Sequence, residues 1–151
     1  MEKLPQAVSA ELSVIAHATE DVEKVCQAAR NILPVELRGK ITLTRTPLTG
    51  HHGNPITSLK AALTDRNMTE RLIKDLVLRL SSLDRTFLSD NLDQCIDHEG
   101  NLYLRFDKQS AYQGEIRLRQ DDPIRMKLRF HGKRCTTESV RRVCREMGLI
   151  V

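Results

Sequence analysis

The chain has 151 residues, which is long enough to bury a hydrophobic core without a disulfide or a metal ion. Its 40% hydrophobic and 29% charged residues are typical of a globular protein, and the absence of a long apolar run excludes a membrane-spanning helix. The formal net charge of +4 is uneven. Residues 1–100 carry 12 Lys and Arg against 14 Asp and Glu, whereas residues 101–151 carry 12 against 6. This basic last third indicates a polyanionic partner.

The four cysteines, at positions 26, 95, 135 and 144, form no Cys-x-x-Cys pair. Cys26 and Cys144 fall within apolar helical patterns, where a thiol behaves as a small hydrophobic side chain. The first residues lack the apolar segment of a signal peptide. We therefore expect a cytoplasmic protein with reduced cysteines and no membrane partner.

Hydrophobic periodicity predicts the elements of the first half of the chain. In order, they are a strand over 11–18, a helix over 19–33, strands over 39–46 and 56–63, and a helix over 67–80. Thr19 or Asp21 can cap the first helix, and Pro34 ends it. Asn67 and Glu70 have the spacing of a capping box at the start of the second helix. Two glycines and an Asn-Pro step between the second and third strands predict a hairpin with a long loop.

The second half continues with a helix over 81–96, strands over 101–107, 115–120 and 124–130, and a helix over 137–148. The resulting order, β-α-β-β-α-α-β-β-β-α, groups the strands into hairpins instead of alternating them with helices. It predicts an α+β fold, with a mainly antiparallel sheet and helices packed on one face. We expect a single domain over residues 1–151, within which residues 11–66 and 67–151 could form two lobes.

The last three predicted strands place apolar side chains on one face and charged side chains on the other. The outward positions are Tyr103, Arg105, Asp107, Glu115, Arg117, Arg119, Arg125, Lys127 and Arg129. Six of these nine are cationic, and like charges on neighbouring strands destabilise a sheet unless an anion covers them. A nucleic-acid backbone is one such anion, although the residues alone also allow a face that is simply solvated.

The segment between the first two of these strands offers Lys108, Gln109 and Tyr112. A cation, an amide and an aromatic ring together suit an unstacked RNA base, because they can hold phosphate, read an edge and stack. The competing interpretation is that Tyr112 only packs the segment onto the sheet, as most lone tyrosines do.

His51 and His52 are adjacent in the predicted hairpin loop. Neighbouring residues of an extended loop point in different directions, and a zinc site needs three or four ligands, so we predict no metal site. No nucleophile elbow, paired-carboxylate signature or phosphate-binding glycine loop is present either. We therefore predict no cofactor and no catalytic residue, with both histidines exposed at the hairpin tip, where they could touch phosphate or bases.

Three segments carry a resemblance to a known family: IAHATEDVEKV, GHHGNPI and GNLYLRFDKQSAYQGEIRL, in this order. Together they resemble the archaeal RNA-binding protein family described as predicted exosome subunits, over residues 11–148. The resemblance implies a small α+β RNA-binding protein associated with RNA processing, with no catalytic residues assigned. It also implies that one surface contains His51, Asn54, Lys108, Gln109 and Tyr112.

The leading hypothesis is a non-catalytic RNA-binding protein, an accessory factor in RNA processing or degradation that binds the RNA backbone on the basic face. The predicted RNA-binding residues are Arg105, Lys108, Gln109, Tyr112, Arg117, Arg119, Arg125, Lys127, Arg129, His51, His52 and Asn54. Exosome or other RNA-processing proteins are the expected protein partners. The alternative is a scaffold subunit, as a homodimer or within a larger complex, without direct RNA binding. A nuclease that uses His51 or His52 as acid or base is the least favoured hypothesis.

Overall fold

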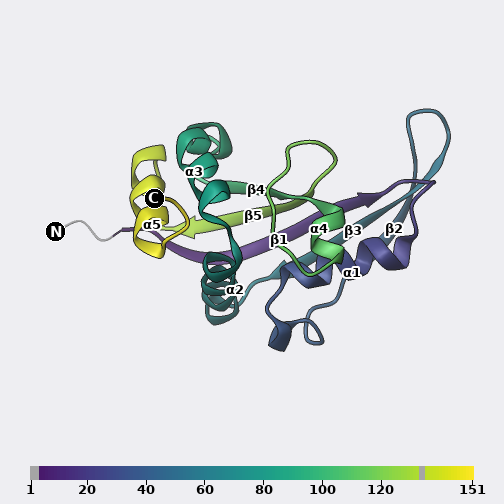
Figure 1. Ribbon diagram of the computed structural model, residues 1–151, viewed down its shortest axis with the longest axis horizontal. Coiled ribbons are helices and arrows are strands. Elements are labelled where there is room, and N and C mark those ends of the chain that lie inside the picture. Colours follow the sequence, from purple (N-terminus) through teal and green to yellow (C-terminus); the bar gives the residue numbers. More distant parts are fainter. Residues whose placement is uncertain (1–3, 133–134) are drawn as a thin grey trace.

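The computed structural model describes residues 4–132 and 135–151 (Figure 1). The strands are β1 (Gln6–Ala16), β2 (Thr44–Thr49), β3 (Pro55–Leu63), β4 (Leu102–Phe106) and β5 (Ile124–His131). The α-helices are α1 (Val22–Ile32), α2 (Arg66–Arg79), α3 (Ser82–Asn91), α4 (Lys108–Tyr112) and α5 (Thr137–Met147), with short 3-10 turns η1 (Val35–Leu37) and η2 (Leu92–Cys95). None of the helices within these described ranges is long and apolar enough to cross a membrane.

All five strands form one antiparallel sheet in the order β2-β3-β1-β5-β4. The long first strand, β1, therefore lies at the centre, between β3 from the first half of the chain and β5 from the second. Its register shifts between Ala7 and Ser9, where a bulge interrupts the pairing with β5. The topology thus brings segments far apart in the sequence onto one continuous sheet.

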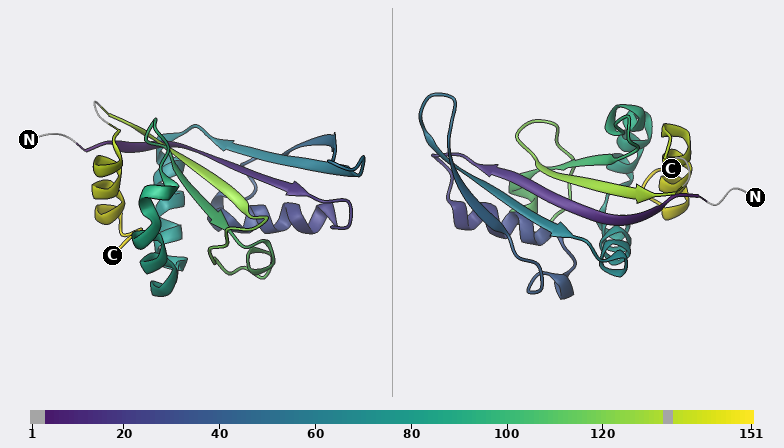
Figure 2. Two further views of the ribbon diagram at one scale, coloured as in Figure 1. Left: turned by 90° about the horizontal axis from the view of Figure 1, so that it is seen from above. Right: turned by 180° about the vertical axis from the view of Figure 1, so that it is seen from behind.

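The helices cover one face of this sheet, as Figure 2 shows in the view from above. The strand residues that face them are apolar and almost fully buried, among them Leu12, Leu59, Leu104, Met126 and Leu128. The predicted α+β class, the antiparallel sheet and the one-sided helix layer are confirmed. The inward alternation expected over residues 102–106 and 124–130 is confirmed as well.

The helices begin after residues whose side chains accept hydrogen bonds from the free backbone amides of the first turn. Asp21 caps α1, and its carboxylate accepts a hydrogen bond from Glu23 N at 2.9 Å. The capping box expected at Asn67 is wrong, because Asp65 is the cap and accepts from the amides of Asn67 and Met68. Aspartate caps a helix as well as asparagine does, so the cap lies two residues earlier than the box spacing indicated and the helix begins at Arg66.

Three segments differ most from the sequence-based expectation, in addition to β1, which spans Gln6–Ala16 and not 11–18. The strand expected over 39–46 is found at 44–49, within a β2–β3 hairpin whose loop is shorter than expected. The segment predicted as a loop between 107 and 115 contains α4, which begins at the cap Asp107. The strand expected over 115–120 makes only a single bridge to β4, between Leu118 and Phe106.

The short helix α4 is held against α1 by polar groups that are buried between them. The amide of Asn31 donates to the carbonyl oxygens of Ala111 and Tyr112, at 2.9 and 3.3 Å. Arg79 of α2 donates to the carbonyl oxygens of Asn31 and Gly114, at 2.7 and 3.3 Å. The Asn31 amide thus satisfies carbonyl groups left free at the end of α4, and Arg79 satisfies one at the end of α1, so these contacts complete both helices while positioning α4.

Candidate nucleic-acid interface

The face of the sheet opposite the helices is uncovered (Figure 2). Residues paired directly across antiparallel strands point to the same side, so the register assigns the side chains of this face. They form three rows: Lys60–Ser13–Arg125–Arg105, then Ala62–Glu11–Lys127–Tyr103, then Ser9–Arg129. We call the surface made by these three rows the open face.

The open face carries five cations and a single carboxylate, that of Glu11. The cations are Lys60, Arg105, Arg125, Lys127 and Arg129. Within the described ranges, none of the five has a carboxylate oxygen within 4.0 Å. Sequence reasoning missed Lys60, since β3 lies beside β1 only because of the strand order. The open face therefore keeps most of its positive charge available to an outside partner.

Arg105 and Arg125 face each other directly across β4 and β5. Like charges in this position cost stability, and a bound anion removes the cost. The guanidinium of Arg125 lies over the ring of Tyr103, with its central carbon 4.7 Å from the ring centroid. This cation–π contact fixes the direction of Arg125, so that its donors are presented in a defined place.

Tyr103 is itself anchored by Asp97, which precedes β4. The hydroxyl of Tyr103 donates to Asp97 Oδ2 at 2.9 Å, and Asn101 donates to both carboxylate oxygens of Asp97. Burial alone would raise the pKa of Asp97, but the hydrogen bonds from Asn101 and Tyr103 outweigh it and lower that pKa to about 2. Burial, followed by the bond to Asp97, raises the pKa of the Tyr103 hydroxyl. Asp97 therefore stays ionised and the Tyr103 hydroxyl stays protonated, which preserves the hydrogen bond that holds Tyr103 in place.

Arg117 and Arg119 lie on the segment beside β4 and are already paired. Arg119 N donates to Arg105 O at 2.9 Å, which extends the first row of the open face beyond β4. Its guanidinium lies 3.7 Å from Asp107, and that of Arg117 lies 3.3 Å from Glu115. Both guanidinium groups are solvent-exposed, which weakens the pairs and leaves part of the positive charge accessible.

Lys108 points away from the open face, into a cluster of polar groups. Its ammonium donates to Ile15 O at 2.7 Å, to Glu20 Oε1 at 3.0 Å and to the carboxylate of Asp122 at 3.0 Å. Its side chain is only 12% exposed. Lys108 thus ties α4 to the end of β1 and to the segment that leads into β5.

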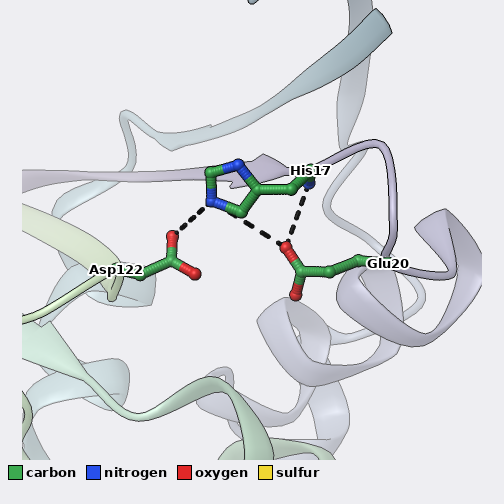
Figure 3. Close-up of side chains that lie close together, drawn as sticks. All are labelled: His17, Glu20 and Asp122. Atoms are coloured by element: carbon green, nitrogen blue, oxygen red, sulfur yellow. Dashed lines mark hydrogen bonds and ion pairs between the residues drawn. The ribbon is translucent and has the colours of Figure 1, made fainter. Parts of the chain in front are cut away.

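His17, Glu20 and Asp122 meet at the same place (Figure 3). His17 Nε2 lies 2.8 Å from Asp122 Oδ1, and one ligand atom from each of the three residues lies within 4.8 Å of the others. The set resembles a cation site, but the Lys108 ammonium already bonds both carboxylates. Partial burial would raise the pKa of Asp122, and the hydrogen bonds from His17 and Lys108 reverse this and lower it. The Lys108 ammonium therefore balances the charge of the two carboxylates, as a bound cation would.

Gln109 and Tyr112 lie on α4, at the edge of the helical layer (Figure 1). Both are exposed, and Tyr112 is 45% accessible to solvent. The backbone of Tyr112 is held by Asn31, while its ring remains available for contact. Their part in RNA binding stays a prediction.

His51, His52 and Asn54 form the exposed tip of the β2–β3 hairpin. Gly50 N donates to Asn54 O at 2.6 Å, and Gly53 turns the chain with a φ of 78°, which glycine adopts without strain. The two imidazole rings contact each other edge-on, with centroids 5.0 Å apart. No hydrogen bond or ion pair that the structure describes joins this tip to α4, so the surface implied by the family resemblance spans two separate elements.

The model of the family described as "RNA binding" matches residues 9–130. The chain belongs to this family. The RNA-binding protein PAB1135 of Pyrococcus abyssi is 31% identical over 143 residues, which cover 93% of each chain. Among solved structures, protein AF2318 from Archaeglobus fulgidus has a TM-score of 0.81 at 31% identity and covers 94% of this chain and 99% of its own. Mth689, a DUF54 protein from Methanothermobacter thermautotrophicus, has a TM-score of 0.75 at 28% identity over 96% and 98%.

Proposed function

We propose that this protein binds RNA without catalysing a reaction, and that the open face holds the RNA backbone. The observation that carries the proposal is the set of five cations on one uncovered sheet face, none of which has a carboxylate partner among the described residues. Membership of the RNA-binding family supports the ligand class. In this role the protein would be an accessory factor that presents or protects RNA during processing or degradation, as the resemblance to predicted exosome subunits implies.

The physical basis is the release of counter-ions. Neighbouring strands lie about 4.8 Å apart, so cations on adjacent strands can follow successive phosphates across the sheet. Each phosphate neutralised by Lys or Arg releases a condensed cation into solution and favours binding at low salt. Arg125, fixed over Tyr103, would add a planar fork that suits bidentate phosphate contact.

The test is a titration of labelled RNA, in both single-stranded and hairpin form, followed by fluorescence anisotropy over a series of salt concentrations. Five phosphate contacts predict that log K falls against log salt with a slope of roughly −3 to −5. A flat salt response, or no binding at the lowest salt, would contradict the proposal. Crosslinking to RNA followed by peptide mapping should then recover peptides from β4 and β5.

A protein-contact role is the second candidate, and one observation favours it. Leu78 near the end of α2 and Leu83 at the start of α3 are large apolar side chains that are 82% and 79% exposed, and Phe87 is exposed one turn further on. Exposed apolar side chains in one region are typical of interaction surfaces. Light scattering after nuclease treatment would show a stable dimer if this surface or the open face joins two copies.

A further inference from the structure

The open face is hollowed at its centre. The hollow has a volume of about 240 Å³ and is lined by residues of β1, β3 and β5, together with Thr44 at the start of β2 and Thr42 just before it. The side chains that matter for its chemistry are Glu11, Ser13, Thr44, Lys60, Arg125 and Lys127. This volume is smaller than a pocket for a drug-sized ligand, and it suits one sugar-phosphate unit of a longer chain.

The hollow has a definite internal arrangement. Ser13 and Glu11 lie on the central strand β1, and cations flank them on both neighbouring strands. Lys60 approaches from β3, while Arg125 and Lys127 approach from β5. No aromatic side chain lines the hollow within the residues described, so it offers nothing on which a base could stack. It is therefore suited to the backbone of a nucleic acid and not to its bases.

Glu11 is the feature that a phosphate-binding surface alone does not explain. Its carboxylate lies on a face prepared for anions, where it repels phosphate. Lys127 is its direct neighbour across β1 and β5, yet no ion pair or hydrogen bond to the Glu11 carboxylate is found in the described ranges. A carboxylate at neutral pH only accepts hydrogen bonds, and so does a phosphodiester. Glu11 is exposed, so water solvates its carboxylate in the free protein. When a nucleic-acid backbone displaces that water, only a hydrogen-bond donor of the ligand can replace it favourably.

We propose that the hollow holds one ribonucleotide unit and that the Glu11 carboxylate accepts a hydrogen bond from its ribose 2′-hydroxyl. The 2′-hydroxyl is the one donor in the sugar-phosphate backbone of RNA, and DNA lacks it. Lys60, Arg125 and Lys127 hold the adjacent phosphates, while Glu11 makes the site unfavourable for a backbone without the donor. The inference rests on the proposed function and adds that Glu11 is the residue that selects RNA over DNA.

The experiment compares oligonucleotides of one sequence that differ only at the 2′ position: RNA, 2′-fluoro RNA and 2′-deoxy chains. The 2′-fluoro chain keeps the sugar pucker and size of RNA, but it cannot donate a hydrogen bond. The unaltered protein should bind RNA about tenfold more tightly than 2′-fluoro RNA, which is the effect of one hydrogen bond to a charged group. In Glu11→Ala the two affinities should become equal, because the acceptor is lost and the repulsion is relieved for both ligands.

Two further variants sharpen the result. Glu11→Gln keeps a carbonyl acceptor and should retain part of the preference for RNA. Glu70→Ala removes an exposed carboxylate from α2, in the helical layer, and should leave the ratio of the two affinities unchanged.

Equal binding of RNA and 2′-fluoro RNA by the unaltered protein would overturn the inference, and so would an unchanged preference in Glu11→Ala. In either case RNA still binds, and the proposed function stands. No binding to any of the three oligonucleotides would instead contradict the proposed function, and the inference with it.

Discussion

Two regions made from neighbouring parts of the sequence use their cations in opposite ways. On the open face, Arg105, Arg125 and Arg129 have no carboxylate partner in the part of the chain that the structure describes. In the edge segment, which we define as residues 107–122, Lys108 bonds two carboxylates and Arg117 and Arg119 each have one. The cations of the edge segment are thus paired with carboxylates of the fold, and Lys108 also joins the segment to the end of β1.

The difference shows that a basic composition is not a measure of binding capacity. A cation whose carboxylate partners lie within the fold contributes to stability and little to the net field outside. A cation that faces only other cations raises the energy of the free protein and is stabilised by an anion. Substitutions in the open face should therefore change RNA affinity, whereas substitution of Lys108, the largely buried cation of the edge segment, should change stability.

The largest effect is expected from Arg105→Gln combined with Arg125→Gln. The double variant should bind RNA about a hundredfold more weakly at moderate salt, because two charge-assisted phosphate contacts are lost. Its free energy of unfolding should stay within about 0.5 kcal/mol of the unaltered protein, because a pair of facing like charges is removed. Anisotropy titrations and urea unfolding would measure both quantities.

The matched control is Arg117→Gln combined with Arg119→Gln, which removes the same charge from the edge segment. It should weaken RNA binding less than about tenfold, because these guanidinium groups are shared with Glu115 and Asp107. Equal losses in the two double variants would show that only net charge matters.

Lys108→Met should lower the free energy of unfolding by about 2 kcal/mol while leaving RNA affinity nearly unchanged. The substitution leaves Glu20 and Asp122 as adjacent carboxylates without their ammonium partner. Solvent at the half-exposed Asp122 limits the loss. Lys74→Met, at an exposed position of α2, serves as the control in the same urea experiment. A stable Lys108→Met variant with impaired RNA binding would instead place Lys108 in the interface.

Asp97→Asn should lower the free energy of unfolding by about 1 kcal/mol at neutral pH, by weakening the support of Tyr103. The pKa of Asp97 in the folded protein is about 2, below its usual 3.8. A lowered folded-state pKa adds stability that is present above the unfolded value and is lost as the pH falls through the folded value. The difference between the two proteins should therefore close between about pH 4 and pH 2. A difference that persists at the lowest pH would assign the loss to packing.

The smallest effect is expected from His51→Ala combined with His52→Ala. RNA affinity should fall less than about threefold, because exposed contacts from a loop contribute little. A loss as large as that of the arginine pair would move the interface to the hairpin tip, and anisotropy titration would reveal it.

Alternation in the sequence was sufficient to predict the side of the sheet to which Arg105, Arg125 and Lys127 point, because a strand with one buried face has a period of two. It could not predict that Lys60 joins them, since this depends on β1 lying between β3 and β5. The direction of the Lys108 side chain could not be predicted from the sequence either. Two of its partners, Ile15 and Glu20, are 93 and 88 residues away, and no local pattern records such a contact.

The local sequence pattern also failed to predict the structure of the edge segment, for a physical reason. The alternation of Ile116 and Leu118 with charged residues is that of a strand, and Ile116 is indeed buried. Two backbone hydrogen bonds join Arg117 and Arg119 to the end of β4, but the pairing extends no further toward α4, because Glu115 N donates to Ser110 O in the turn where Gly114 has a φ of 86°. The packing of α4 against α1 thus limits the length of a strand that the sequence pattern favours.

The central place of β1 has a consequence for biosynthesis. β1 is made first, yet one of its edges is completed only by β5, and Ser13 and its partner Arg125 are 112 residues apart in the chain. While the protein emerges from the ribosome, that edge has no neighbour until the last third has been translated, and unpaired edges invite association with other chains. Truncation before residue 124 should therefore yield an aggregating fragment. The sheet can be completed only after β5 has been translated.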